Sequence, residues 1–113
     1  GDHRDVVDAV ANGLAEGGAM DGHIWETLRR FRPEAVRNTR VVAKSAEYGF
    51  PPIVARASLP ADDVVAVQRA LQDMSASPQG MALLDALNLS GFAAGNPRLY
   101  QSIEDNLKLV IGN

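Results

Sequence analysis

The chain begins with apolar residues at helical spacing. Valine at positions 6, 7 and 10 and leucine at position 14 follow the i, i+3, i+4 pattern of one helix face. Asp2 precedes them and is expected to cap the helix, because its carboxylate accepts from the first free backbone N–H groups. Gly13 is expected to end the helix, since glycine readily adopts the left-handed conformation found at helix ends. We therefore predict a helix over about residues 2–13.

The same spacing predicts four more helices. The second begins near Gly22 and is interrupted at Pro33, because proline disfavours helical conformation in the residue before it. Leu59–Pro60 opens the third. The last two begin at Ser77–Pro78 and Asn96–Pro97, where the first residue is expected to cap the helix and proline to take the first helical position. Their apolar stripes are expected to face a core and consist of Val64, Val67, Leu71, Met74, Met81, Leu84, Leu87, Leu99, Ile103, Leu107 and Val110.

Three further stretches are typical of β-strands. Residues 16–20 lie in LAEGGAMD, a short stretch rich in small residues; residues 39–46 read TRVVAKSA, and residues 52–57 read PIVARA and begin at the second of two adjacent prolines. The resulting order, α-β-α-β-β-α-α-α, predicts an α/β segment with a small sheet and packed helices. Three strands make a narrow sheet for so much apolar helix surface. We therefore expect a missing partner segment, or self-association, to cover the remainder.

Size and charge narrow the functional classes. The chain has 113 residues, within the usual range of one domain. Its net charge of −3 argues against a nucleic-acid binder that relies on a general positive field. A local cluster of arginines could still attract an anion or an acidic partner, although a solvated face is the default interpretation: Arg29, Arg30, Arg32, Arg37 and Arg40.

Few residues suggest site chemistry on their own. There are no cysteines, so disulfides and thiolate metal sites are absent, and no phosphate loop, dinucleotide motif or nucleophile motif occurs. His3 at a helix start could donate to a phosphate or carboxylate, or could be an ordinary exposed histidine. His3, His23 and Asp21 match no standard zinc spacing, so no metal and no cofactor are predicted. Trp25, with Tyr48 and Phe50, could line a cleft or belong to a core or interface.

Three longer pieces together resemble one family. They read DHRDVVDAVANGLAEGGAMDG, TRVVAKSAEYGFPPIVARASLPADD and LLDALNLSGFAAGNPRLY. In order and spacing they are similar to the C-terminal portion of the substrate-binding proteins of phosphonate, phosphite and phosphate ABC importers, within the type 2 periplasmic binding protein class. The resemblance covers nearly the whole chain.

The resemblance implies two α/β lobes that close on an oxyanion. Residues 1–113 would be one segment of such a protein, with about 1–50 from lobe two and the crossover and about 51–113 returning to lobe one. His3 matches the family's histidine at a lobe-two helix start, and His23 falls near a second contact position. The loop before PPIVAR implies further ligand contacts from Tyr48, Gly49, Phe50 and Pro51, whose rigid proline pair would hold the aromatic rings beside the ligand.

The chain also departs from the family pattern. Asp2 stands where the family has a small polar residue before the histidine, and a carboxylate is a poor neighbour for an anion. Glu16 stands where aspartate is usual. Pro51 stands where some members place an acid for an amino group, which makes an aminoalkyl phosphonate a less suitable ligand. The family's Ser/Thr-rich helix start belongs to an N-terminal half that this sequence lacks.

The resemblance implies a non-enzymatic solute receptor outside the cytoplasm. It would capture a small oxyanion such as a phosphonate or phosphate and present it to the membrane subunits of an ABC importer, with no nucleic acid involved. The alternative is a ligand-sensing input domain of a membrane signalling protein. A small hydrolase using His3 or His23 is a third interpretation. We also expect an isolated half to form a homo-oligomer, because it exposes apolar surface.

Overall fold

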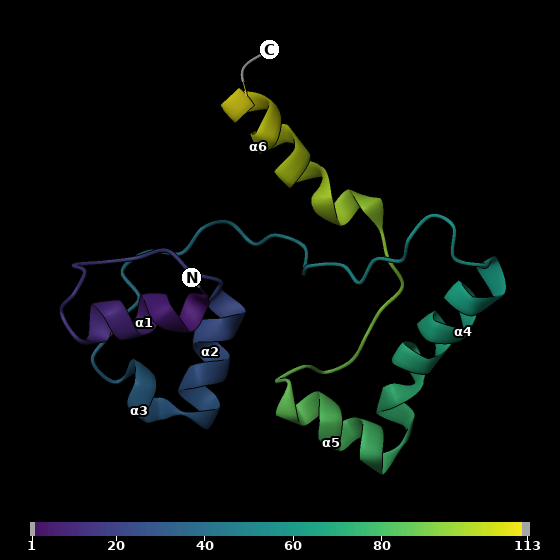
Figure 1. Ribbon diagram of the computed structural model, residues 1–113, viewed down its shortest axis with the longest axis horizontal. Coiled ribbons are helices and arrows are strands. Elements are labelled where there is room, and N and C mark those ends of the chain that lie inside the picture. Colours follow the sequence, from purple (N-terminus) through teal and green to yellow (C-terminus); the bar gives the residue numbers. More distant parts are fainter. Residues whose placement is uncertain (1, 112–113) are drawn as a thin grey trace. The chain divides into compact units, whose positions relative to one another are not determined.

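Helices make up all the regular secondary structure in the computed structural model, which describes residues 2–111 (Figure 1). The chain divides into two compact units, Gly1–Ser45 and Ala46–Asn113, and each is described by itself. The N-terminal unit contains α1 (His3–Ala11), α2 (Gly22–Phe31) and α3 (Pro33–Val36). The C-terminal unit contains α4 (Ala61–Gln72), η1 (Asp73–Ala76), α5 (Pro78–Ala86), η2 (Pro97–Tyr100) and α6 (Gln101–Ile111).

The predicted helix starts of the N-terminal unit are confirmed. Asp2 caps α1 and forms a reciprocal capping box with Asp5, while the Asp21 side chain caps α2 by accepting from the backbone N–H groups of His23 and Ile24. Gly13 has a φ of 73°, the left-handed conformation expected after the first helix. Pro33 ends the second helix as predicted and opens the short α3.

A small hydrophobic cluster holds the N-terminal unit together. Val7 of α1, Leu28 of α2 and Val36 of α3 are each less than one-tenth exposed. Met20, Ile24 and Trp25 pack against them. Because α3 contacts both longer helices, these residues fix the start of α1 and the start of α2 in one arrangement.

The predicted starts of the C-terminal helices are also confirmed. Ser77 accepts from the backbone N–H of Gly80 at 3.0 Å and Pro78 is the first residue of α5. Asn96 caps η2, which leads directly into α6. Gly80 and Leu84 are the buried residues of α5, and contacts join α4 to η1, η1 to α5, and η2 to α6.

The prediction of an α/β fold with a small sheet was wrong. No strand occurs within residues 2–111, and the three segments predicted as strands are irregular in secondary structure. β-branched residues favour extended conformation, but a strand forms only when a neighbouring strand takes its backbone hydrogen bonds. Here Val42 and Val54 are both 81% exposed, so neither segment is covered. The β-branched pattern of these segments therefore did not predict their structure.

The expected core of the C-terminal helices is also not formed. The stripe residues of α4 and α6 were expected to be buried, but Val67 is 53%, Leu107 54% and Val110 84% exposed. Spacing indicates which face of a helix is apolar and cannot show whether a partner covers that face. These faces therefore remain without a partner in the part of the chain that the structure describes.

Candidate functional site

Two helix starts meet at Asp21. The backbone N–H of Asp21 donates to Nδ1 of His3 at 3.2 Å, and Oδ1 of Asp21 accepts from the backbone N–H of His23 at 2.8 Å. His3 is the first residue of α1, and His23 is the second residue of α2. We call His3, Asp21 and His23 the helix-start junction. The structure thus brings together both histidines that the sequence singled out.

The hydrogen bond to Asp21 sets the tautomer of His3. Since Nδ1 accepts, the proton of the neutral imidazole lies on Nε2. The His3 side chain is exposed, so this N–H is accessible to a ligand. His3 can therefore act as a neutral donor at the start of a helix.

His23 is held more tightly than His3. Its residue is half-buried, and Nε2 lies 3.4 Å from Oγ1 of Thr27. The Thr27 hydroxyl donates to the His23 backbone carbonyl at 2.7 Å, so its oxygen accepts from the imidazole. This contact orients the ring along α2.

Carboxylates already occupy both helix starts. Asp2 accepts from the backbone N–H groups of Arg4 at 2.6 Å and Asp5 at 3.2 Å, and these hydrogen bonds lower the pKa of its carboxyl below the ordinary value. The capping contribution of Asp2 to stability is therefore present at neutral pH and lost as the pH falls through that lowered pKa. At neutral pH an incoming anion meets the negative charge of Asp2 as well as that of Asp21.

The corner predicted to line a cleft lies in the other unit. Tyr48 Oη accepts from Nδ2 of Asn106 at 3.1 Å, and Tyr100 Oη donates to the carbonyl of Phe50 at 2.8 Å. A Cβ on Gly49 would lie 2.8 Å from the Leu99 carbonyl oxygen, so only glycine fits this close approach. The corner thus packs against η2 and α6, and both Tyr48 and Phe50 are about half exposed.

Pro51 is exposed beside this corner. The role of Tyr48, Gly49, Phe50 and Pro51 as ligand contacts stays a prediction. They and the two histidines belong to different compact units, so the structure groups the predicted site residues into two sets.

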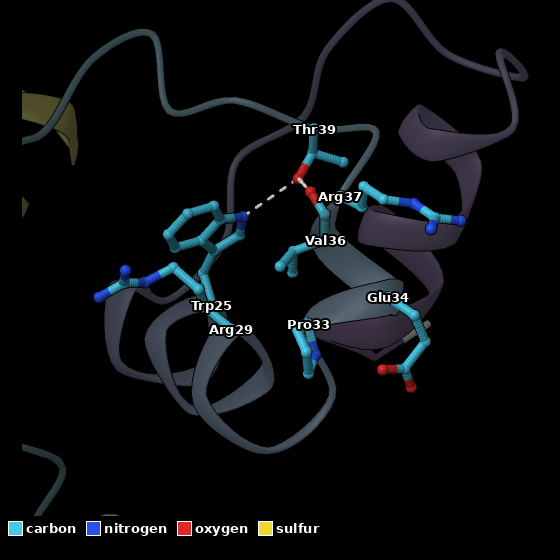
Figure 2. Close-up of a pocket in the computed structure, with 7 residues that line it drawn as sticks. All are labelled: Trp25, Arg29, Pro33, Glu34, Val36, Arg37 and Thr39. Carbon is cyan, nitrogen blue, oxygen red and sulfur yellow. Dashed lines mark hydrogen bonds between the residues drawn. The ribbon is translucent and has the colours of Figure 1, made fainter.

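The N-terminal unit also contains an open pocket that the sequence did not predict. It has a volume of about 490 Å³ and lies in the N-terminal unit between Trp25 of α2 and the α3 segment (Figure 2). Nε1 of Trp25 donates to Oγ1 of Thr39 at 3.3 Å, and the Thr39 hydroxyl donates to the Val36 carbonyl at 2.7 Å. Thr39 belonged to a predicted strand, which concealed its contact with the indole. The single tryptophan beside an arginine cluster was the available signal.

Within residues 2–111, no group of three or more histidine, cysteine or acidic residues is placed to hold a metal ion. No helix in this range is long and apolar enough to cross a membrane.

Comparison with known proteins gives one family. The family model described as "ABC transporter, phosphonate, periplasmic substrate-binding protein" matches residues 1–100. No curated protein sequence matches the chain. The matched range includes both helix starts, the two histidines and the Tyr48–Pro51 corner. The chain belongs to the family of periplasmic substrate-binding proteins of phosphonate ABC transporters.

Proposed function

We propose that the helix-start junction is part of a site that binds a small oxyanion, such as a phosphonate or phosphate, for import. The observation that carries this proposal is the hydrogen bond between Asp21 and His3, which joins the starts of α1 and α2. Helix starts present free N–H groups and the positive end of the helix dipole, both of which favour an anion. The family match over residues 1–100 supplies the ligand class.

Three donors remain for a ligand at this junction. Nε2 of His3 carries a proton, and within residues 2–111 no acceptor takes the backbone N–H of His3 or of Gly22. Both amides are the first of their helices, where no carbonyl one turn earlier is available. A tetrahedral oxyanion has several acceptor oxygens, so a set of N–H donors suits it. No proton transfer is needed, in keeping with a receptor that binds its ligand without transforming it.

The first test is an amide NMR titration with methylphosphonate, phosphate and sulfate. We expect saturable shifts at His3, Gly22 and His23, and their loss in His3→Ala, because that change removes the imidazole donor and the contact with Asp21. Leu14→Ala is the matched control, since Leu14 is 83% exposed just beyond the same helix. Shifts that persist unchanged in His3→Ala, or the absence of saturable shifts with all three anions, would contradict the proposal.

A second prediction concerns the carboxylate next to His3. Asp2→Ser keeps a good helix cap while removing one negative charge from the start of α1. We expect methylphosphonate affinity to rise about three- to tenfold at low salt, as estimated for one like charge at close range in water. The gain should shrink as salt is added. Unchanged affinity at every salt concentration would show that the anion does not bind near Asp2.

We also propose that the chain is the C-terminal part of a two-lobed receptor. About residues 1–50 would come from lobe two and the crossover, and about 51–113 would return to lobe one. The unpaired β-type segments and the exposed apolar stripes of α4 and α6 support this, because both require neighbours that residues 2–111 do not provide. The whole receptor would act outside the cytoplasm with the membrane subunits of an ABC importer. Self-association of the chain stays a prediction.

A further inference from the structure

Positive charge is concentrated in one part of the N-terminal unit. Six of the chain's eleven basic residues lie between positions 29 and 44, together with only one of its fourteen acidic residues. The whole chain has a net charge of −3, so this stretch is opposite in sign to the rest. Such a local reversal attracts and orients an anionic partner more than it stabilises a fold.

Four of these six cations, Arg29, Arg37, Arg40 and Lys44, line a shallow groove beside Trp25. A second open pocket of about 480 Å³ adjoins the one described above and shares Trp25, Arg29 and Thr39 with it. We call the combined surface the Trp25 groove, and its remaining lining residues used below are Pro33, Val36, Arg40 and Lys44. Figure 2 shows the Val36 side chain pointing toward the indole, whereas Glu34 and Arg37 extend away from it. The part of the groove beside the Trp25 ring is therefore apolar.

Two cations at the edge of the groove have no compensating charge. Arg29 pairs with Glu26 at 2.8 Å and lies 6.0 Å from the centre of the Trp25 ring. Arg40 and Lys44 are exposed, and neither forms an ion pair within residues 2–111. An apolar part beside the Trp25 ring, with uncompensated cations on one side, matches a ligand that combines an apolar side chain with carboxylates.

We propose that the Trp25 groove binds an acidic peptide segment of a protein partner. One apolar side chain of the segment lies against the Trp25 ring, and its carboxylates pair with Arg40 and Lys44. Trp25 is half-buried in a hollow, so an inserted side chain reaches it more readily than the surface of a bilayer does. The Trp25 indole N–H is already bound to Thr39, which leaves the ring to apolar contact. None of these residues belongs to the helix-start junction.

The single tryptophan makes the groove directly observable. The probe is a capped peptide with six glutamates around a central phenylalanine, titrated into the full chain at low salt and followed by Trp25 fluorescence. We expect saturation with a dissociation constant below about 1 mM. Replacing the glutamates by lysines should abolish binding, and replacing the phenylalanine by serine should weaken it.

Charge-reversed variants locate the contact. Arg40→Glu combined with Lys44→Glu should lower the affinity for the glutamate peptide by about tenfold or more, since two attractive contacts become repulsive. Arg56→Glu combined with Arg69→Glu makes the same change of charge on exposed residues of the C-terminal unit and should have little effect. The methylphosphonate shifts at His3 should survive in both variants, which separates this proposal from the oxyanion site.

Three results would overturn the proposal. The first is a Trp25 fluorescence signal that does not saturate with the glutamate peptide. The second is an equal loss of affinity for this peptide in the two double variants. The third is a response of Trp25 to phosphatidylserine vesicles without a response to the peptide, which would identify the groove as a membrane-facing surface. Equal binding of the serine and phenylalanine peptides would overturn the role of the apolar part of the groove.

Discussion

Leu28→Ala is expected to unfold most of the N-terminal unit. Leu28 is 7% exposed and packs in one cluster with the other two buried side chains described in this unit, Val7 and Val36. Truncation of a buried leucine typically costs about 2–5 kcal/mol. A unit of this size has a total free energy of unfolding of about 2–7 kcal/mol at the usual value per residue. The loss is therefore comparable with the whole stability of the unit. Urea unfolding followed by Trp25 fluorescence, which reports on the same cluster, measures it.

Leu14→Ala is the matched control for this experiment. It removes the same atoms from a residue that is 83% exposed, so the expected change is below about 0.5 kcal/mol. Leu28→Ala should also release Asp21 from His3, and the loss of the methylphosphonate shifts would follow. Similar unfolding midpoints for the two variants would show that the Val7–Leu28–Val36 cluster does not determine the stability of the unit.

The sequence predicted most helix boundaries because their signals are local. Asp2, Ser77 and Pro78 act within one turn of their own position, and their roles as caps and first residues are confirmed. Gly13 and Pro33 likewise end helices through their own backbone conformations. These features need no information from distant parts of the chain.

The sheet could not be predicted from the same kind of signal. Val41, Val42, Ile53 and Val54 favour extended backbone, yet a strand also requires a second strand at the correct distance and register. The same limit applies to α6, where Leu107 and Val110 define an apolar stripe that nothing covers within residues 2–111. Local pattern thus identified which face of α6 is apolar, and the missing information was the identity of the neighbour.

The candidate site, like the fold, could be predicted from the sequence only in part. His3 and His23 were selected through the family resemblance, and the structure joins them through Asp21, which the sequence analysis did not identify as a cap. The hydrogen bond between residues 3 and 21 depends on how α1 and α2 pack around Leu28, which no local pattern encodes. The Trp25 groove depends in the same way on the contact between Trp25 and Thr39.

Among the described glycines, Gly80 has the least space for a side chain. It is buried at the start of α5, and its backbone N–H is the group that Ser77 caps. A Cβ at this position would overlap the Met74 carbonyl group, including its oxygen, carbon and Cα. Because these are backbone atoms of η1, relief requires the turn between η1 and α5 to move. Met74 and Gly80 therefore approach as closely as they do only because residue 80 has no side chain.

Gly80→Ala is accordingly expected to destabilise the C-terminal unit by about 3 kcal/mol, the upper end of the range for an overpacked site. In a helix, alanine is normally more stabilising than glycine. A loss of stability in Gly80→Ala would therefore come from the steric overlap of the added Cβ and not from helix propensity. Gly91→Ala is the control, since no atom lies within 4 Å of its added Cβ and its φ is not positive; it should be neutral or slightly stabilising. Hydrogen exchange of the α5 amides, from Met81 to Leu84, measures the effect locally. Faster exchange in Gly80→Ala alone would confirm that the η1–α5 approach organises this unit, whereas equal exchange in both variants would show that η1 moves aside at little cost.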